Sequence, residues 1–176
     1  MRRLRCRLTV ALLTLAVCVL AARNVDSVLA AGTAAVTLNV ENASPRSVED
    51  TTKAAVARDY AAAWQSMTEA LDQNRPDLLS ANFTGTAQQR LNETIEAQRK
   101  ASLHQHCVDK GHSIDVVFYS PDGSAIELHD TARLQLQLLD GNKVVHSEDS
   151  TVRYVVLLTA AENSWNVRLL EAVPAF

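Results

Sequence analysis

The hydrophobic positions follow two different periods along the chain. Between residues 56 and 71 they recur at steps of three and four, which predicts one buried stripe of an amphipathic helix. The members of this stripe are Val56, Tyr60, Ala63, Trp64, Met67 and Leu71. Pro76 is well placed to begin a short second helix, and a third helix is expected from about Ala87 to Leu103.

From His112 onward the period changes to two, which is typical of strands. Four strands are expected, at about residues 112–119, 126–138, 143–159 and 165–173, with turns at Pro121-Asp122-Gly123 and Asp140-Gly141-Asn142. Consecutive hairpins make an antiparallel sheet, and strands of up to about 15 residues must twist and curl. The pattern therefore predicts an α+β fold, with three N-terminal helices packed on a curved four-stranded antiparallel sheet.

The N-terminus indicates export. Residues 1–23 combine four early arginines with an uncharged run, Leu8–Ala22, and are expected to act as a signal peptide or membrane anchor. Fifteen helical residues span roughly 22 Å, short of a hydrocarbon core of about 30 Å, which favours cleavage. Cleavage motifs end at Ala21 and Ala30, and Leu15–Cys18 is similar to a lipoprotein signal. The chain is thus expected outside the cytoplasmic membrane, at its periplasmic or extracellular face, or secreted if cleaved.

Residues 24–46 are small, polar and unpatterned, and predict a flexible linker. The folded domain is expected at residues 47–176, where Ser47 and Asp50 have the spacing of a helix capping box. Five of the 17 basic residues lie in the first 23 positions, so 12 basic and 20 acidic residues remain in the rest of the chain. This acidic balance repels phosphate backbones and excludes nucleic acid as a partner.

The long helix with Tyr60 and Trp64, the helix at Pro76, the third helix and the strands ending in Ser164-Trp165-Asn166-Val167 resemble the NTF2-like superfamily. The resemblance covers residues 50–174. It implies a cone-shaped α+β fold, shared by SnoaL-like cyclases and ketosteroid isomerases. It is also shared by non-catalytic extracytoplasmic domains such as Mce-associated proteins.

Asp130 is the most informative candidate for chemistry, because it interrupts the apolar side of the second strand. A carboxylate facing a dry pocket has a raised pKa and can act as a general base. His146 and Glu148, on the next strand, are expected to join Asp130 in a polar group. The alternatives are a β-bulge that turns Asp130 outward, and an exposed strand section at residues 146–149.

Two further groups are candidates for binding. His104, His106, Cys107 and His112 offer imidazole and thiol ligands for Zn or Cu, although histidines at a helix end also serve as caps. Tyr60, Trp64 and Met67 are expected to line any cavity of the cone, or to be plain core residues. No cofactor-binding motif is present in the sequence, so no cofactor is expected.

The sequence therefore favours a non-enzymatic scaffold, accessory or binding module of the cell envelope. Its partners would be another protein, a second copy bound through the sheet, or the membrane if the N-terminal segment is retained. The alternative function is a SnoaL-like enzyme or small-molecule binder that uses Asp130 and His146. A small-molecule ligand is compatible with either function.

Overall fold

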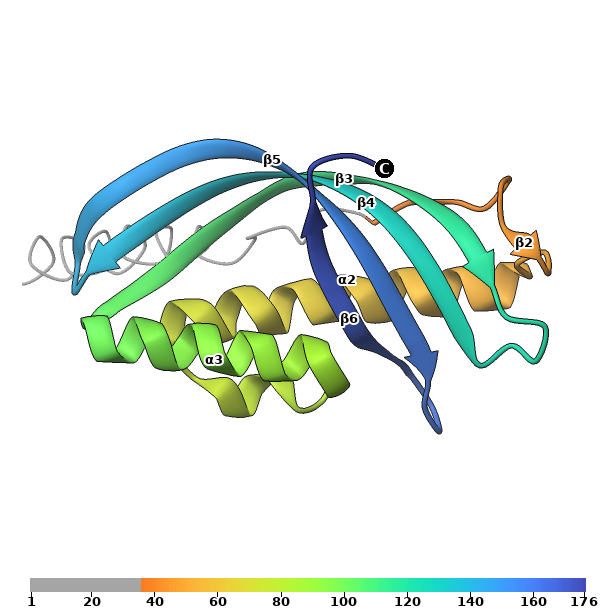
Figure 1. Cartoon of the computed structure of the whole chain (residues 1–176), viewed down its shortest axis with the longest axis horizontal. Coiled ribbons are helices and arrows are strands. Elements are labelled where there is room, and N and C mark those ends of the chain that lie inside the picture. The colour runs from red at the N-terminus through yellow and green to blue at the C-terminus, as the bar shows by residue number, and fades with distance from the viewer. Residues whose placement is uncertain (1–35) are drawn as a thin grey trace, which may run out of the picture. The chain divides into compact units, whose positions relative to one another are not determined.

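The computed structural model describes residues 36–176, and the predicted signal or anchor segment with its cleavage motifs lies outside them. Within the described part, one sheet curves over two α-helices (Figure 1). The helices are α2 (Asp50–Gln73) and α3 (Gly85–Ala101), joined through the short 3₁₀ helix η1 (Pro76–Leu79). None of the described helices is both long enough and apolar enough to span a membrane.

Six strands form a mixed sheet in place of the predicted four-stranded antiparallel one. The four long strands are β3 (Leu103–Tyr119), β4 (Ala125–Asp140), β5 (Lys143–Ala160) and β6 (Trp165–Val173), and they pair antiparallel in that order. Two short strands, β1 (Leu38–Asn39) and β2 (Ser44–Pro45), pair parallel with β3. The described end of the predicted linker is therefore attached to the sheet, and Leu38 is buried there.

The helices differ from prediction in number and in their first turns. The segment at Pro76 is a single 3₁₀ turn, so two α-helices are described where three were expected. The capping box at Ser47 does not form, because α2 begins at Asp50 with Glu49 as its N-cap residue. Glu49 instead accepts a 2.6 Å hydrogen bond from Arg46, which draws its carboxylate away from the helix amides.

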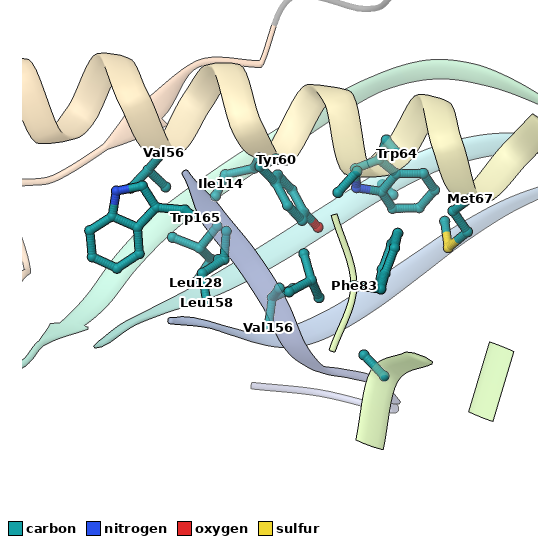
Figure 2. Packing of buried hydrophobic residues seen from close by; sticks show 14 of the residues in the cluster. Val56, Tyr60, Trp64, Met67, Phe83, Ile114, Leu128, Val156, Leu158 and Trp165 are labelled. Carbon is teal, nitrogen blue, oxygen red and sulfur yellow. The ribbon is translucent and has the colours of Figure 1, made fainter. Parts of the chain in front are cut away.

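The core lies between α2 and the concave face of the sheet. The predicted stripe of α2 is buried throughout, and it packs against the alternate residues of β4 and β5 that face inward. Figure 2 shows Tyr60 and Trp64 projecting from α2 toward the strands, with Val156, Leu158 and Trp165 beneath the helix. The long helix and the alternating strand therefore form the two layers that their patterns predicted.

The most consequential local difference is the start of β3. The predicted third helix ends at Ala101, where Ser102 adopts a left-handed conformation with φ of 58°. The chain then enters β3 at Leu103, nine residues before the predicted first strand. His104, His106 and Cys107 consequently lie on a strand and not at a helix end.

Candidate functional site

Asp130 lies at the centre of the inner face of the sheet. The pairing of β4 runs through it without a shift, opposite Ile114 on β3 and Tyr154 on β5, so the alternative of an outward-turning bulge is wrong. Its side chain is fully buried, and its Oδ2 accepts a 2.7 Å hydrogen bond from the hydroxyl of Tyr60 on α2. The other carboxylate oxygen, Oδ1, is buried without a hydrogen-bond partner among the described residues.

His112 lies between two carboxylates. Its Nδ1 is 2.8 Å from Oδ2 of Asp130, and its Nε2 is 3.1 Å from Oδ2 of Asp109. The imidazole is fully buried, whereas the Asp109 side chain is 20% exposed. A protonated imidazole donates from both nitrogens, so the imidazolium form satisfies both carboxylates at once.

A β-bulge brings Asp109 and His112 to the same face. Asp109 pairs with Leu134 and His112 pairs with Ala132, so β3 contains one more residue than β4 over this interval. The extra residue reverses the alternation, and without it His112 would point outward. Gly111 has φ of +123°, a conformation that favours glycine, and its N–H donates a 2.7 Å bond to Asp109.

The electrostatics of this cluster favour a charged His112. Burial opposes its charge, but the hydrogen bonds and negative charges of Asp130 and Asp109 outweigh burial and raise the pKa of His112. Burial, followed by the charge and hydrogen bond of Asp130, raises the pKa of Tyr60 well above its usual value. Tyr60 therefore remains a hydrogen-bond donor, and the cluster of Tyr60, Asp109, His112 and Asp130 ties α2 to β3 and β4.

Aromatic rings enclose this cluster on the side of the helices. The centroid of the Trp64 ring lies 4.6 Å from that of His112, and the Tyr154 ring lies edge-on to Trp64 at 5.7 Å between ring centroids. Trp64 is 5% exposed. Trp64 therefore covers the buried His112 ring on the side of α2.

A cavity of about 270 Å³ lies beyond these rings, between the two α-helices and the inner face of the sheet. Its walls are largely apolar and include Trp64, Met67, Leu91, Leu134, Leu136 and Leu170. Trp64 and Met67, two of the three residues expected to line a cavity or to be plain core, lie in this wall and are also buried core residues. Tyr60 is not in this wall; its hydroxyl donates to Asp130, and its ring lines a second, small apolar cavity together with Trp64 and Met67.

The described polar groups of the cavity wall are poorly suited to acid–base chemistry at neutral pH. Burial and the charge of Asp109 raise the pKa of Cys107 to about 11. Burial, followed by the charges of Cys107 and Asp130, raises the pKa of Tyr154 to about 12. Arg90, the charged group in the wall, lies 3.5 Å from Glu171 in a half-exposed ion pair. The arrangement provides shape and apolar surface for binding.

His146 and Glu148 do not join Asp130. Asp130 pairs with Tyr154 on β5, whereas His146 pairs with Leu138 at the far end of the same hairpin. Eight residues of strand separate the two positions, roughly 26 Å at about 3.3 Å per residue. His146 and Glu148 are 3.5 Å apart and both more than half exposed, which matches the alternative of an exposed strand section.

The four residues predicted as metal ligands occupy three different environments. His104 and His106 share one face of β3, and their Nδ1 atoms lie 3.1 Å from the two carboxylate oxygens of Asp72 on α2. Cys107 lines the cavity, and His112 belongs to the buried cluster. No group of three or more ligating residues suited to a metal ion occurs among residues 36–176.

The sequence matches no protein-family model and no curated protein. Solved structures with a similar fold include the intermembrane space region of chloroplast protein ARC6, at a TM-score of 0.60 and 13% identity. That match covers 73% of this chain and 98% of the other. It shows that the two chains share an α+β fold, and it shows the fold alone.

Two weaker structural matches accompany it. A Novosphingobium aromaticivorans protein, provisionally named a scytalone dehydratase, has a TM-score of 0.45 at 12% identity and covers 66% of this chain and 83% of its own. Aln2 from a Streptomyces species has a TM-score of 0.46 at 12% identity and covers 71% of this chain and 93% of its own. At these TM-scores neither match bears on activity.

Proposed function

We propose that this chain is a non-enzymatic binding module of the cell envelope, and that its cavity receives an apolar side chain of a protein partner. The observation that carries the proposal is the cavity of about 270 Å³ between α2, α3 and the sheet. The envelope location rests on the arginine-rich, apolar N-terminal segment described above.

The size of the cavity favours an anchoring side chain over a whole small molecule. Pockets for small molecules are commonly about 300–1,000 Å³, so this cavity lies just below that range. Buried anchors that fill such pockets often dominate the affinity of protein–protein interfaces. Leu134, Leu136 and Leu170 supply the apolar surface that such an anchor would cover.

The position of the ionisable cluster argues against catalysis. Asp130 and His112 are absent from the described cavity wall, whereas Trp64, whose ring packs on His112, belongs to that wall. A general base must come within hydrogen-bond reach of its substrate, directly or through one water molecule. His146, the second residue of the alternative function, is remote from both. The cluster instead fastens the helix to the sheet.

The experiment compares Leu136, which lines the cavity, with Leu139, a partly buried residue near the end of β4 that is not in the cavity wall. A photo-crosslinking amino acid is placed at each position in the full chain, and crosslinked envelope proteins are identified after illumination of cells. We expect a specific product from position 136, and we expect Leu136→Lys, but not Leu139→Lys, to abolish partner binding.

Circular dichroism of both lysine variants must show a folded protein. If Leu136→Lys leaves binding intact, the cavity is not the binding site. If native mass spectrometry shows a small apolar molecule in the purified chain that Leu136→Lys removes, the chain is a ligand carrier and the partner proposal is wrong.

A further inference from the structure

The first half of β5 forms an open edge of the sheet. Residues 143–159 pair with β4 along one side, but β6 begins to pair on the other side only at Arg153. Residues 143–149 are all exposed, and no described strand covers their outer edge. Figure 1 shows this part of β5 extending well past the end of β6. An open edge presents unpaired N–H and C=O groups that another strand can pair with.

The charges along this edge are arranged about Ser147. His146 and Glu148 flank it, and both lie on the inner face because they pair with Leu138 and Leu136. They are already 3.5 Å apart within one chain. Asp149 lies opposite Gln135 on the other face, where it accepts a 2.6 Å bond from Lys110 of β3.

We propose that this edge pairs antiparallel with the same edge of a second copy, about a two-fold axis through Ser147. Residues that pair directly across two antiparallel strands lie on the same face of the sheet. A two-fold axis between two identical strands must therefore lie where one residue pairs with its own copy. With the axis at Ser147, each His146 lies opposite Glu148 of the second copy, and the four side chains form a square in which opposite charges alternate when His146 is protonated. Two copies then share one continuous sheet.

Charge disfavours three of the neighbouring registers. An axis through His146, Glu148 or Asp149 places an ionisable residue opposite its own copy, and like charges directly opposite each other are destabilising. At Ser147 the self-paired residue is neutral and small. Opposite-charge pairs at exposed strand positions also set register more than they add affinity.

Disulfide trapping in the full chain tests the register. In a background where Cys6, Cys18 and Cys107 are serine, we expect Ser147→Cys to form an intermolecular disulfide under mild oxidation. Ser150→Cys is the matched control, because its own copy would lie six residues away, roughly 20 Å along the strand and beyond disulfide reach. The detergent-solubilised chain is used at several detergent-to-protein ratios, so that chance pairing within micelles is recognised.

A charge exchange tests the square of side chains. His146→Glu replaces two His–Glu pairs with two repulsive Glu–Glu pairs, and we expect it to weaken dimerisation by about tenfold in sedimentation experiments. The double variant His146→Glu with Glu148→His restores opposite charges and should restore the dimer. Three results would each overturn the proposal. They are equal crosslinking at positions 147 and 150, a monomer at all micromolar concentrations, and failure of the charge exchange to restore the dimer. None of these results depends on the cavity.

Discussion

Replacing Asp130 by asparagine tests whether this buried carboxylate is structural. Asp130 is fully buried and accepts hydrogen bonds of 2.7 Å from Tyr60 and 2.8 Å from His112. Breaking a buried ion pair by removing one partner costs about 3–5 kcal/mol. The asparagine oxygen can still accept from Tyr60, and Asp109 still faces His112. We therefore expect a loss of about 3 kcal/mol in the free energy of unfolding, at the low end of that range.

The assay is urea denaturation of the full chain in mild detergent at pH 6.5, followed by circular dichroism. Asp109→Asn is the matched control, because Asp109 binds the same imidazole from a side chain that is 20% exposed. Solvent compensates part of its loss, so we expect about 1 kcal/mol for the control.

One result would refute this reasoning directly. A carboxylate held in place for function, with its Oδ1 buried and unpartnered, strains the fold, and its neutral replacement then raises stability. If Asp130→Asn is as stable as the original chain or more so, the buried cluster does not stabilise the packing of α2 on the sheet. A functional role for the buried carboxylate of Asp130 would then gain support.

Two further predictions concern stability. The raised pKa of His112 means that its stabilisation is complete below its unfolded pKa of about 6.5 and is lost as pH rises through the folded value. We expect the free energy of unfolding to fall by at most about 1.4 kcal/mol per pH unit as pH rises above 6.5. His112→Gln should flatten this slope in urea titrations more than His104→Gln does, whose side chain is more exposed; equal flattening would contradict the assignment. Gly123→Ala should cost about 1 kcal/mol more than Gly141→Ala in thermal unfolding. Both glycines have positive φ, but a new Cβ at 123 would lie 2.8 Å from Arg46, whereas position 141 is open; equal losses would show that Arg46 moves aside freely.

The sequence predicted the long helix and the second long strand well, because each has one face buried along its length. The stripe from Val56 to Leu71 and the alternation from Ile126 to Leu134 are both buried in the structure. Hydrophobic periodicity reports this kind of burial directly. The break at Asp130 was visible for the same reason, since a single carboxylate stood in an apolar series.

Other elements carried no such signal. Neither face of the first half of β3 carries a series of apolar residues, because His104 and His106 lie on one face and Gln105 and Cys107 on the other. The period of two that marks a strand was therefore not visible there. The short strands β1 and β2 have two residues each and are held by pairing with β3. Pairing of this kind depends on tertiary structure, which a local pattern does not contain.

The partners of Asp130 were missed because their placement depends on register. His112 faces inward only through the bulge after Asp109, and Gly111 was the one local sign of that bulge. His146 was expected near Asp130 because both interrupt neighbouring strands, but the hairpin register separates them by eight positions. The period of two assigns a face to a residue and says nothing about its position along the partner strand.

The buried cluster and the cavity share one wall, and this links stability to binding. Trp64 contacts His112 on one side and lines the cavity on the other, and Tyr154 lies beside both. We expect that loosening the ion pair lets these rings move and changes the shape of the cavity. Variants of Asp130 or His112 are therefore expected to reduce binding in proportion to the stability they lose. A variant such as Leu136→Lys, which leaves the cluster intact, acts on the cavity alone and should reduce binding in a protein that remains folded.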